Sequence, residues 1–156
     1  MNLRHISPNG LCPPARIRAK AVTALLLLVL SGLLASCIPN QVEKSRSEAF
    51  KQYETIIRWS QWDAAISFIA PEYLADHPIT RLDMDRLRLF RVTQYAIRST
   101  SVDDDGMTAR QTVVIGMFNT SQAVERTIID EQLWRYNSEA GVWLLWSPLP
   151  DPTQRY

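Results

Sequence analysis

The cysteine at position 37 has the most informative surroundings of any reactive side chain in this sequence. It ends the tetrapeptide Leu34-Ala35-Ser36-Cys37, which closes a stretch without charged side chains over 21–34. Three basic residues precede that stretch: Arg16, Arg18 and Lys20. A basic start, an apolar stretch and small residues at its end are typical of a secretory leader, so residues 1–36 are expected to stand outside the folded domain.

The tetrapeptide that ends at Cys37 resembles the lipobox of bacterial lipoproteins. The resemblance implies that the leader is cut just before Cys37, that a diacylglycerol is attached to this cysteine, and that the new amino terminus is acylated. In this family an Asp directly after the cysteine resembles an inner-membrane retention signal, and here Ile38 follows instead. The resemblance therefore implies an anchor in the outer membrane, with the domain facing the periplasm.

Two other interpretations of the leader are a transmembrane anchor and an ordinary secretory signal. The apolar stretch is about 14 residues long, whereas a spanning helix needs roughly 20, which disfavours a permanent transmembrane anchor. An ordinary secretory signal with an unrelated cysteine is the other alternative. Several acyl chains hold a protein on a bilayer effectively, at about 0.8 kcal/mol per buried methylene. The chain after the leader is thus expected to be a water-soluble domain that is tethered at one end.

The chain without its leader has 120 of the 156 residues, which suits one domain with its own core. Four of the 17 basic residues leave with the leader and all 16 acidic residues remain, so its net charge is −3. A mildly acidic domain without a basic cluster argues against a nucleic-acid partner. Of the two cysteines, Cys12 leaves and Cys37 would carry lipid, so neither a disulfide nor a cysteine-rich zinc site is expected.

The first half of this chain is predicted to be helical. A short tether is expected over 37–43, and an apolar stripe opposite charged residues predicts a helix over about 42–59. Ser60 is a plausible N-cap for a second helix, which Pro71 should end. The residues that follow Pro71 are expected to be irregular.

Two further features mark this helical part. Trp59 and Trp62 are expected to pin the first two helices to each other. Thr80 and Asp83 have the spacing of a capping box, which predicts a short helix that ends near Leu87.

The second half is predicted to be a meander of four strands. Alternating β-branched and aromatic residues predict strands over 90–101, 107–118, 124–136 and 142–147. Asp105-Gly106 is a strong hairpin signal between the first two strands. Helices followed by linked strands indicate an α+β class, with a single domain over 44–150 and a tail over 151–156.

This arrangement resembles the nuclear-transport-factor-2-like (ketosteroid-isomerase-like) superfamily, also described as cystatin-like. The residues that carry the resemblance are Arg58-Trp59, Trp62-Asp63-Ala64-Ala65, the strands that begin at Phe90 and Met107, Glu131-Gln132-Leu133-Trp134-Arg135-Tyr136 and Val142-Trp143-Leu144-Leu145-Trp146. The resemblance implies a cone-shaped domain, with helices packed into the concave face of a strongly bent sheet of about four strands. The superfamily includes isomerases, dehydratases and non-catalytic binding domains, so fold alone leaves the function open.

Asp130 is the strongest candidate for a catalytic group, with its neighbour Glu131 considered beside it. It shares a strand face with Gln132 and Trp134, and burial in an apolar cavity would raise its pKa and suit it to act as a base. The favoured alternative is a carboxylate paired with an arginine on a solvated face. The candidate partners are Arg91, Arg110 and Arg126.

His77 is the one histidine after the leader, and three aspartates lie near it in the sequence: Asp76, Asp83 and Asp85. Their spacing matches no known metal site, so a surface loop is the expected setting. The run Asp103-Asp104-Asp105-Gly106 lacks the alternating ligands and closing Glu of a calcium loop, which favours a hairpin turn. No metal and no cofactor are expected.

The aromatic residues suggest a binding surface. Trp143 and Trp146 are three apart on a strand, so they should point to opposite faces of the sheet. The candidates for a binding surface are Tyr95, Trp134, Trp143 and Trp146. The leading hypothesis is a non-catalytic binding or scaffold domain for a protein partner or a small apolar ligand. The alternatives are an isomerase-like or dehydratase-like enzyme that uses Asp130, and a structural homodimer.

Overall fold

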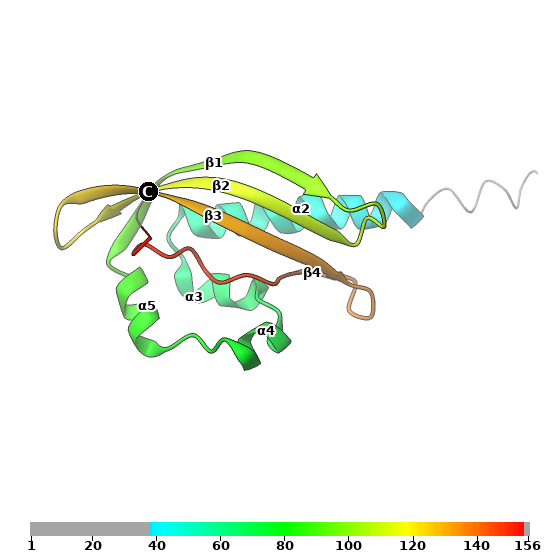
Figure 1. The fold of residues 1–156 in the computed structure, drawn as a ribbon, viewed down its shortest axis with the longest axis horizontal. Coiled ribbons are helices and arrows are strands. Elements are labelled where there is room, and N and C mark those ends of the chain that lie inside the picture. The colour runs from blue at the N-terminus through cyan, green and yellow to red at the C-terminus, as the bar shows by residue number, and fades with distance from the viewer. Residues whose placement is uncertain (1–37, 155–156) are drawn as a thin grey trace, which may run out of the picture. The chain divides into compact units, whose positions relative to one another are not determined.

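A computed structural model describes residues 38–154 of the chain. Helices come first and four strands follow, so the α+β class is confirmed (Figure 1). The leader and Cys37 lie outside the described residues. Within 38–154, no helix has both the length and the apolar character needed to cross a bilayer.

The helix α2 (Ile38–Arg58) begins earlier than the sequence pattern indicated. Residues 38–43 were expected to form an irregular tether, but they form its first turns. Pro39 allows this because it falls in the first turn, where a missing N–H costs no hydrogen bond. Tyr53 and Ile57 are fully buried and mark the face that α2 turns toward the sheet.

The segment after α2 differs from expectation at both of its ends. Ser60 has a φ of 54° and its hydroxyl accepts the Val92 N–H at 2.9 Å, so it bonds to the sheet and is not an N-cap. Gln61 holds the N-cap position of α3 (Trp62–Ala65), without a side-chain bond. The 3₁₀ turn η1 (Ile66–Phe68) follows.

Pro71 was expected to end a helix, but it begins one. It is the first residue of α4 (Pro71–Asp76), a position that suits proline because no N–H is needed there. The expectation for the two tryptophans is half right. Trp62 is buried and donates its Nε1–H to the Phe90 carbonyl at 3.3 Å, whereas Trp59 is 74% exposed and pins nothing.

The capping box at Thr80 is confirmed. The Thr80 hydroxyl accepts the Asp83 N–H at 3.2 Å, and the Asp83 carboxylate accepts the Thr80 N–H at 3.0 Å. These bonds start α5 (Arg81–Leu87), which ends where the sequence pattern indicated. The hydrogen bonds from Thr80 also hold the pKa of Asp83 below its usual value.

The four strands form one antiparallel sheet in the order of the chain. They are β1 (Phe90–Val102), β2 (Thr108–Asn119), β3 (Val124–Asn137) and β4 (Val142–Leu145). The hairpin turn at Asp105-Gly106 is confirmed, and Gly106 has the positive φ of 70° that such a turn requires.

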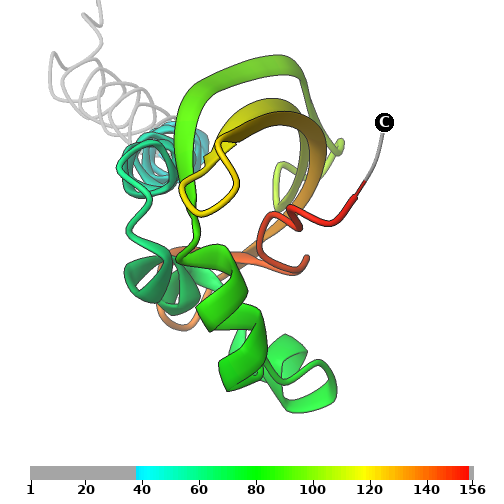
Figure 2. The same ribbon diagram turned by 90° about the vertical axis from the view of Figure 1, so that its left-hand side faces the viewer.

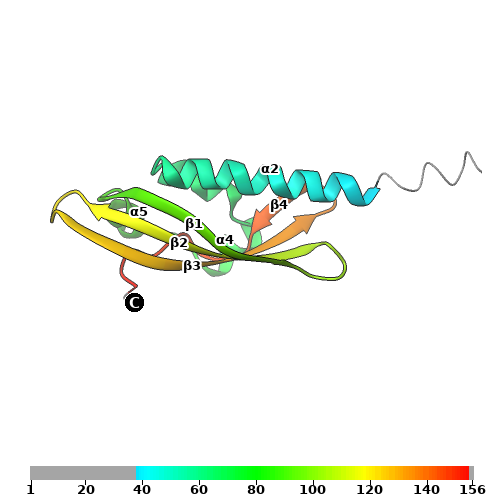
Figure 3. The same cartoon turned by 90° about the horizontal axis from the view of Figure 1, so that it is seen from above.

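The inner face of the sheet forms the core. On β2 the expected alternation is confirmed, because Ala109, Val113, Ile115 and Met117 are all fully buried. The register of β1 against β2 shifts between Val92 and Gln94 and again between Ile97 and Ser99. Such irregularities bend a strand, and Figure 2 shows the sheet curling around its concave side. Figure 3 shows α2 running along the strands.

The segment after β4 lies along the concave side of the sheet. Leu145 is bridged to Ile69, and its carbonyl accepts the Ala70 N–H at 2.9 Å. Further on, Leu149 is 7% exposed, and the Pro152 carbonyl accepts a hydrogen bond from the Arg126 side chain at 3.1 Å. We call residues 147–152 the closing segment, because they cover the open side of the core.

Candidate functional site

A group of polar side chains is buried between α2 and the inner face of the sheet. Asp130, Gln132 and Trp134 come from β3, where residues two apart share a face. Tyr95 comes from β1, and Tyr53 comes from α2, which lies against that face. Each of the five is at most 8% exposed, and we call them the Asp130 cluster.

Gln132 joins three other members of the Asp130 cluster. Its Nε2 donates to the Asp130 carboxylate at 2.6 Å and to the Tyr95 hydroxyl at 3.1 Å. Its Oε1 accepts the Nε1–H of Trp134 at 3.1 Å. The side chain therefore uses both its donor and its acceptor groups within the core.

Burial sets the acid–base properties of the Asp130 cluster. Desolvation raises the pKa of Asp130 to about 6, against the opposing effect of the hydrogen bond from Gln132. Burial also raises the pKa of both Tyr53 and Tyr95, and the negative charge of Asp130 adds to each shift. The tyrosines therefore stay protonated, while Asp130 titrates in the range where a general base operates.

The prediction that Asp130 pairs with an arginine is wrong. In the described part of the chain Asp130 makes no ion pair, because its strand face is turned into the core. Arg110 pairs with Asp103 at 2.8 Å on the other face. Arg126 shares the inner face, but it bonds to Pro152 and lies over the Phe90 ring at 5.9 Å.

Tyr53 carries the one orphaned polar atom found among the buried side chains of the described residues. Its hydroxyl has no hydrogen-bond partner, although the residue is fully buried. The ring packs edge-on against Trp134, with centroids 5.3 Å apart. Neither Asp130 nor Tyr53 lines any of the three pockets described below.

Three of the four aromatic residues expected on a binding surface lie in the core. Tyr95, Trp134 and Trp143 are 8%, 0% and 3% exposed. The reason is that their strand face packs against α2. The ring of Phe50, on α2, lies with its centroid 5.0 Å from that of Trp134. These three residues are therefore parts of the core and not a free surface.

Trp146 is the exception, and it follows the last residue of β4, Leu145, although it was expected to lie within the strand. It is half-buried, and the Arg135 guanidinium lies over its ring at 4.6 Å. The backbone N–H of Trp146 donates to the Leu133 carbonyl at 2.7 Å. The Arg135 guanidinium therefore covers one side of the Trp146 ring.

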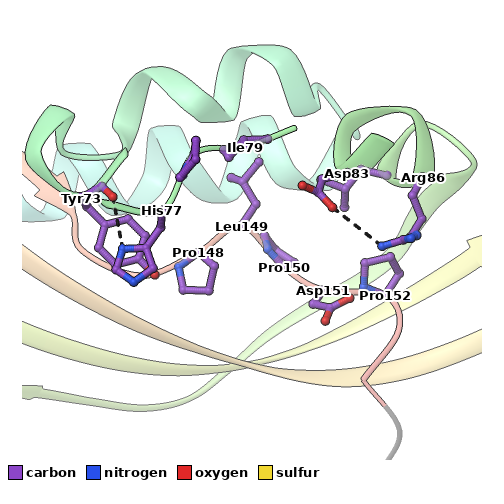
Figure 4. A pocket seen from close by; sticks show the side chains of 12 residues that line it. Tyr73, His77, Ile79, Asp83, Arg86, Pro148, Leu149, Pro150, Asp151 and Pro152 are labelled. Atoms are coloured by element: carbon purple, nitrogen blue, oxygen red, sulfur yellow. Dashed lines mark hydrogen bonds and ion pairs between the residues drawn. The ribbon is translucent and has the colours of Figure 1, made fainter. Parts of the chain in front are cut away.

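An open pocket of about 420 Å³ lies between α4, α5 and the closing segment (Figure 4). Its apolar walls come from Tyr73, Ile79, Leu87 and Leu149, together with the prolines Pro78, Pro148, Pro150 and Pro152. We call it the proline pocket. Its volume lies in the range of small-molecule sites, which are mostly apolar with a few polar groups.

The polar groups of the proline pocket gather at its two ends (Figure 4). At one end His77 stacks on Tyr73, with centroids 4.4 Å apart, and its Nδ1 lies 3.3 Å from the Tyr73 carbonyl. At the other end Arg86 pairs with Asp83 at 3.8 Å. Two smaller pockets lie beside Trp59 and beside Val142, with volumes of about 410 and 350 Å³.

The remaining metal candidates have structural roles in the described residues. His77 lies in the proline pocket, and residues 38–154 contain no group of three potential ligands that includes it. In the turn after β1, Asp103 pairs with Arg110 and the Asp105 carboxylate accepts the Met107 N–H at 2.8 Å. These contacts are those of a hairpin turn.

The proline pocket was not predicted from the sequence. Its walls come from segments about seventy residues apart, and no local pattern joins Tyr73 to Leu149. The one available signal was the apolar Leu149 between two prolines. The Asp130 cluster was predicted in part, because Gln132 and Trp134 share the strand face of Asp130. The contribution of α2 to the cluster was not predicted.

Comparisons of the chain with protein-family models, with curated proteins and with solved structures find no match.

Proposed function

We propose that the chain is a lipid-anchored envelope protein whose domain binds a partner and does not catalyse a reaction. Cys37 carries the lipid in the outer membrane, and the domain faces the periplasm. The support for the anchor is the leader and the lipobox resemblance that ends at Cys37. We assign the domain to the nuclear-transport-factor-2-like kind, in keeping with helices on the concave side of a curled antiparallel sheet.

The proline pocket is the binding site in this proposal, and its apolar lining is the observation that carries it. It is open to solvent, whereas the Asp130 cluster is sealed by α2 and the sheet. Proline and aromatic walls hold an apolar group with little loss of side-chain entropy, because they are rigid before binding. The ligand is an apolar small molecule or an apolar side chain of a partner protein.

The anchor is tested by a Cys37→Ser substitution in the full chain. Mass spectrometry should find a cleaved, acylated amino terminus in the original protein and no acylation in the variant. An unmodified Cys37 thiol, or an uncleaved precursor in the cytosol, contradicts the anchor.

The binding site is tested by photo-crosslinking in the native envelope. A benzoylphenylalanine at position 148, on the rim of the proline pocket, should give a discrete adduct with a protein or a small molecule. The matched control carries the same group in place of Glu131, which is exposed on the other face of the sheet. Equal adducts from both positions, or none from position 148, contradict the site.

Catalysis by Asp130 is a second candidate, favoured by its burial and its pKa of about 6. Proton abstraction from a small apolar substrate would need access that opens when α2 or the closing segment moves. An Asp130→Asn variant should then lose turnover, while Glu131→Gln on the opposite face keeps it. Equal turnover by the two variants excludes this candidate.

A further inference from the structure

The start of α2 and two turns of the sheet lie at one end of the domain. The Val42 carbonyl, near the start of α2, accepts the Nε1–H of Trp143 at 3.2 Å. Trp143 packs on Tyr136, with centroids 5.6 Å apart, and the Tyr136 N–H donates to the Met107 carbonyl at 2.9 Å. Figures 1 and 3 show the β1–β2 and β3–β4 turns at the end where α2 begins. We call this the proximal end.

Chain length ties Cys37 to the proximal end. The helix α2 begins at Ile38, so one peptide unit of about 3.8 Å separates Cys37 from the first residue of the helix. From Val42, α2 continues for sixteen residues to Arg58, which is about 24 Å along a helix. A lipid on Cys37 therefore lies nearer to the proximal end than to the other end of α2.

The proximal end presents apolar side chains to solvent. Val102 is 38% exposed, Met107 is 40% exposed and Val142 is 44% exposed. Val102 and Met107 flank the β1–β2 turn, and Val142 begins β4 after the turn at Gly141. The turn itself carries three acidic side chains, Asp103, Asp104 and Asp105, of which Asp103 is paired with Arg110.

We propose that the proximal end rests on the bilayer, with Val102, Met107 and Val142 in the headgroup region. The inference rests on the proposed lipid at Cys37, which brings these side chains to the membrane surface and raises their local concentration there. The free energy falls when apolar side chains leave water and enter the interface. The acidic turn is repelled by anionic lipids, so the surface that fits is zwitterionic, such as phosphatidylethanolamine.

The test compares two exposed side chains at opposite ends of the same sheet. Met107 is 40% exposed and Phe118, near the β2–β3 turn, is 37% exposed, so M107C and F118C form a matched pair. In the full chain, matured and lipidated, each introduced thiol is the one available for labelling. Each variant is purified from membranes, labelled with a fluorophore and reconstituted into phosphatidylethanolamine–phosphatidylcholine vesicles that carry spin-labelled quencher lipids.

The label at position 107 should lose most of its fluorescence to the quencher lipids, and the label at position 118 should lose little. Equal quenching, or stronger quenching at 118, overturns the proximal end as the membrane surface. With phosphatidylglycerol in place of the zwitterionic lipids, quenching at 107 should weaken. If it does not, the lipid class is wrong.

The unsubstituted protein separates this inference from the proposed anchor. If Cys37 carries lipid, that protein takes up no label and floats with the vesicles. If it takes up label and stays in solution, the anchor itself fails. Equal quenching at the two positions in a protein that floats contradicts the orientation alone. Matching circular dichroism spectra of both variants guard against misfolding.

Discussion

Gln132 donates a hydrogen bond of 2.6 Å to Asp130, two residues away on the same strand. The same amide group serves the Tyr95 hydroxyl and the Trp134 indole. Three buried polar side chains therefore depend on one neutral side chain. A carboxylate held in the core by an amide, without a cation, links the stability of the domain to pH.

An Asp130→Asn substitution should remove that link. Because burial raises the pKa of Asp130 from 3.8 to about 6, the folded chain binds its proton more tightly than the unfolded chain. The free energy of unfolding should therefore fall as the pH rises from below 4 to above 6, by about 3 kcal/mol. Urea unfolding of Asp130→Asn at pH 4 and pH 7.5 should lack this fall, and Glu131→Gln should keep it. An unchanged fall in Asp130→Asn contradicts the assignment.

A Gln132→Leu substitution should destabilise the domain by more than the change in side-chain volume explains. It leaves the Trp134 indole N–H and the Asp130 carboxylate without their partner, and each buried unpaired group costs about 1–3 kcal/mol. It should also move the pH midpoint upward from about 6, because the bond from Gln132 opposes the rise in the pKa of Asp130. Gln132→Glu is no control here, since it adds a charge, whereas Gln122→Leu is exposed and should be neutral. A loss below about 1 kcal/mol for Gln132→Leu contradicts the network.

Two substitutions of Ser60 should differ in how much they destabilise the domain. Ser60→Ala removes the acceptor of the Val92 N–H and keeps the positive φ of 54°, so it should cost about 1–3 kcal/mol. Ser60→Gly loses the same bond but adopts a positive φ without strain, so it should cost less. Thermal unfolding ranks the two variants. Equal losses would mean that the backbone at Ser60 stores no strain.

The capping box at Thr80 gives a prediction on the helix that lines the proline pocket. Thr80→Ala should lower the free energy of unfolding by about 1 kcal/mol, because the Asp83 N–H loses its acceptor. Thr80→Ser keeps the hydroxyl and should lose little. Chemical denaturation of both variants checks the difference, and identical midpoints would show that α5 does not need its cap.

Local patterns predicted the parts of the fold that local interactions determine. The Thr80 capping box and the Asp105-Gly106 turn were right because their hydrogen bonds lie within a few residues. Ser60 and Pro71 were misjudged, since each is compatible with two local structures. The contact of Ser60 with Val92, thirty-two residues away, decides between them.

The candidate site, too, was predicted only as far as local patterns determine it. Strand alternation places Asp130 and Gln132 on one face, but it does not say which face α2 covers. Their burial follows from Tyr53 of α2 packing over that face and from the curl of the sheet, both of which are long-range features. The proline pocket depends on the closing segment folding back to α4, which no periodicity indicates.

The position of the closing segment has a consequence for biogenesis. Leu145 and Leu149 complete a core whose other residues come as early as Tyr53, so a nascent chain that ends before residue 145 exposes its inner sheet face. Such a chain folds only after most of it has been synthesised, because its last core contacts are also among its most distant in sequence. The domain therefore completes its fold only when its C-terminal residues are available to pack.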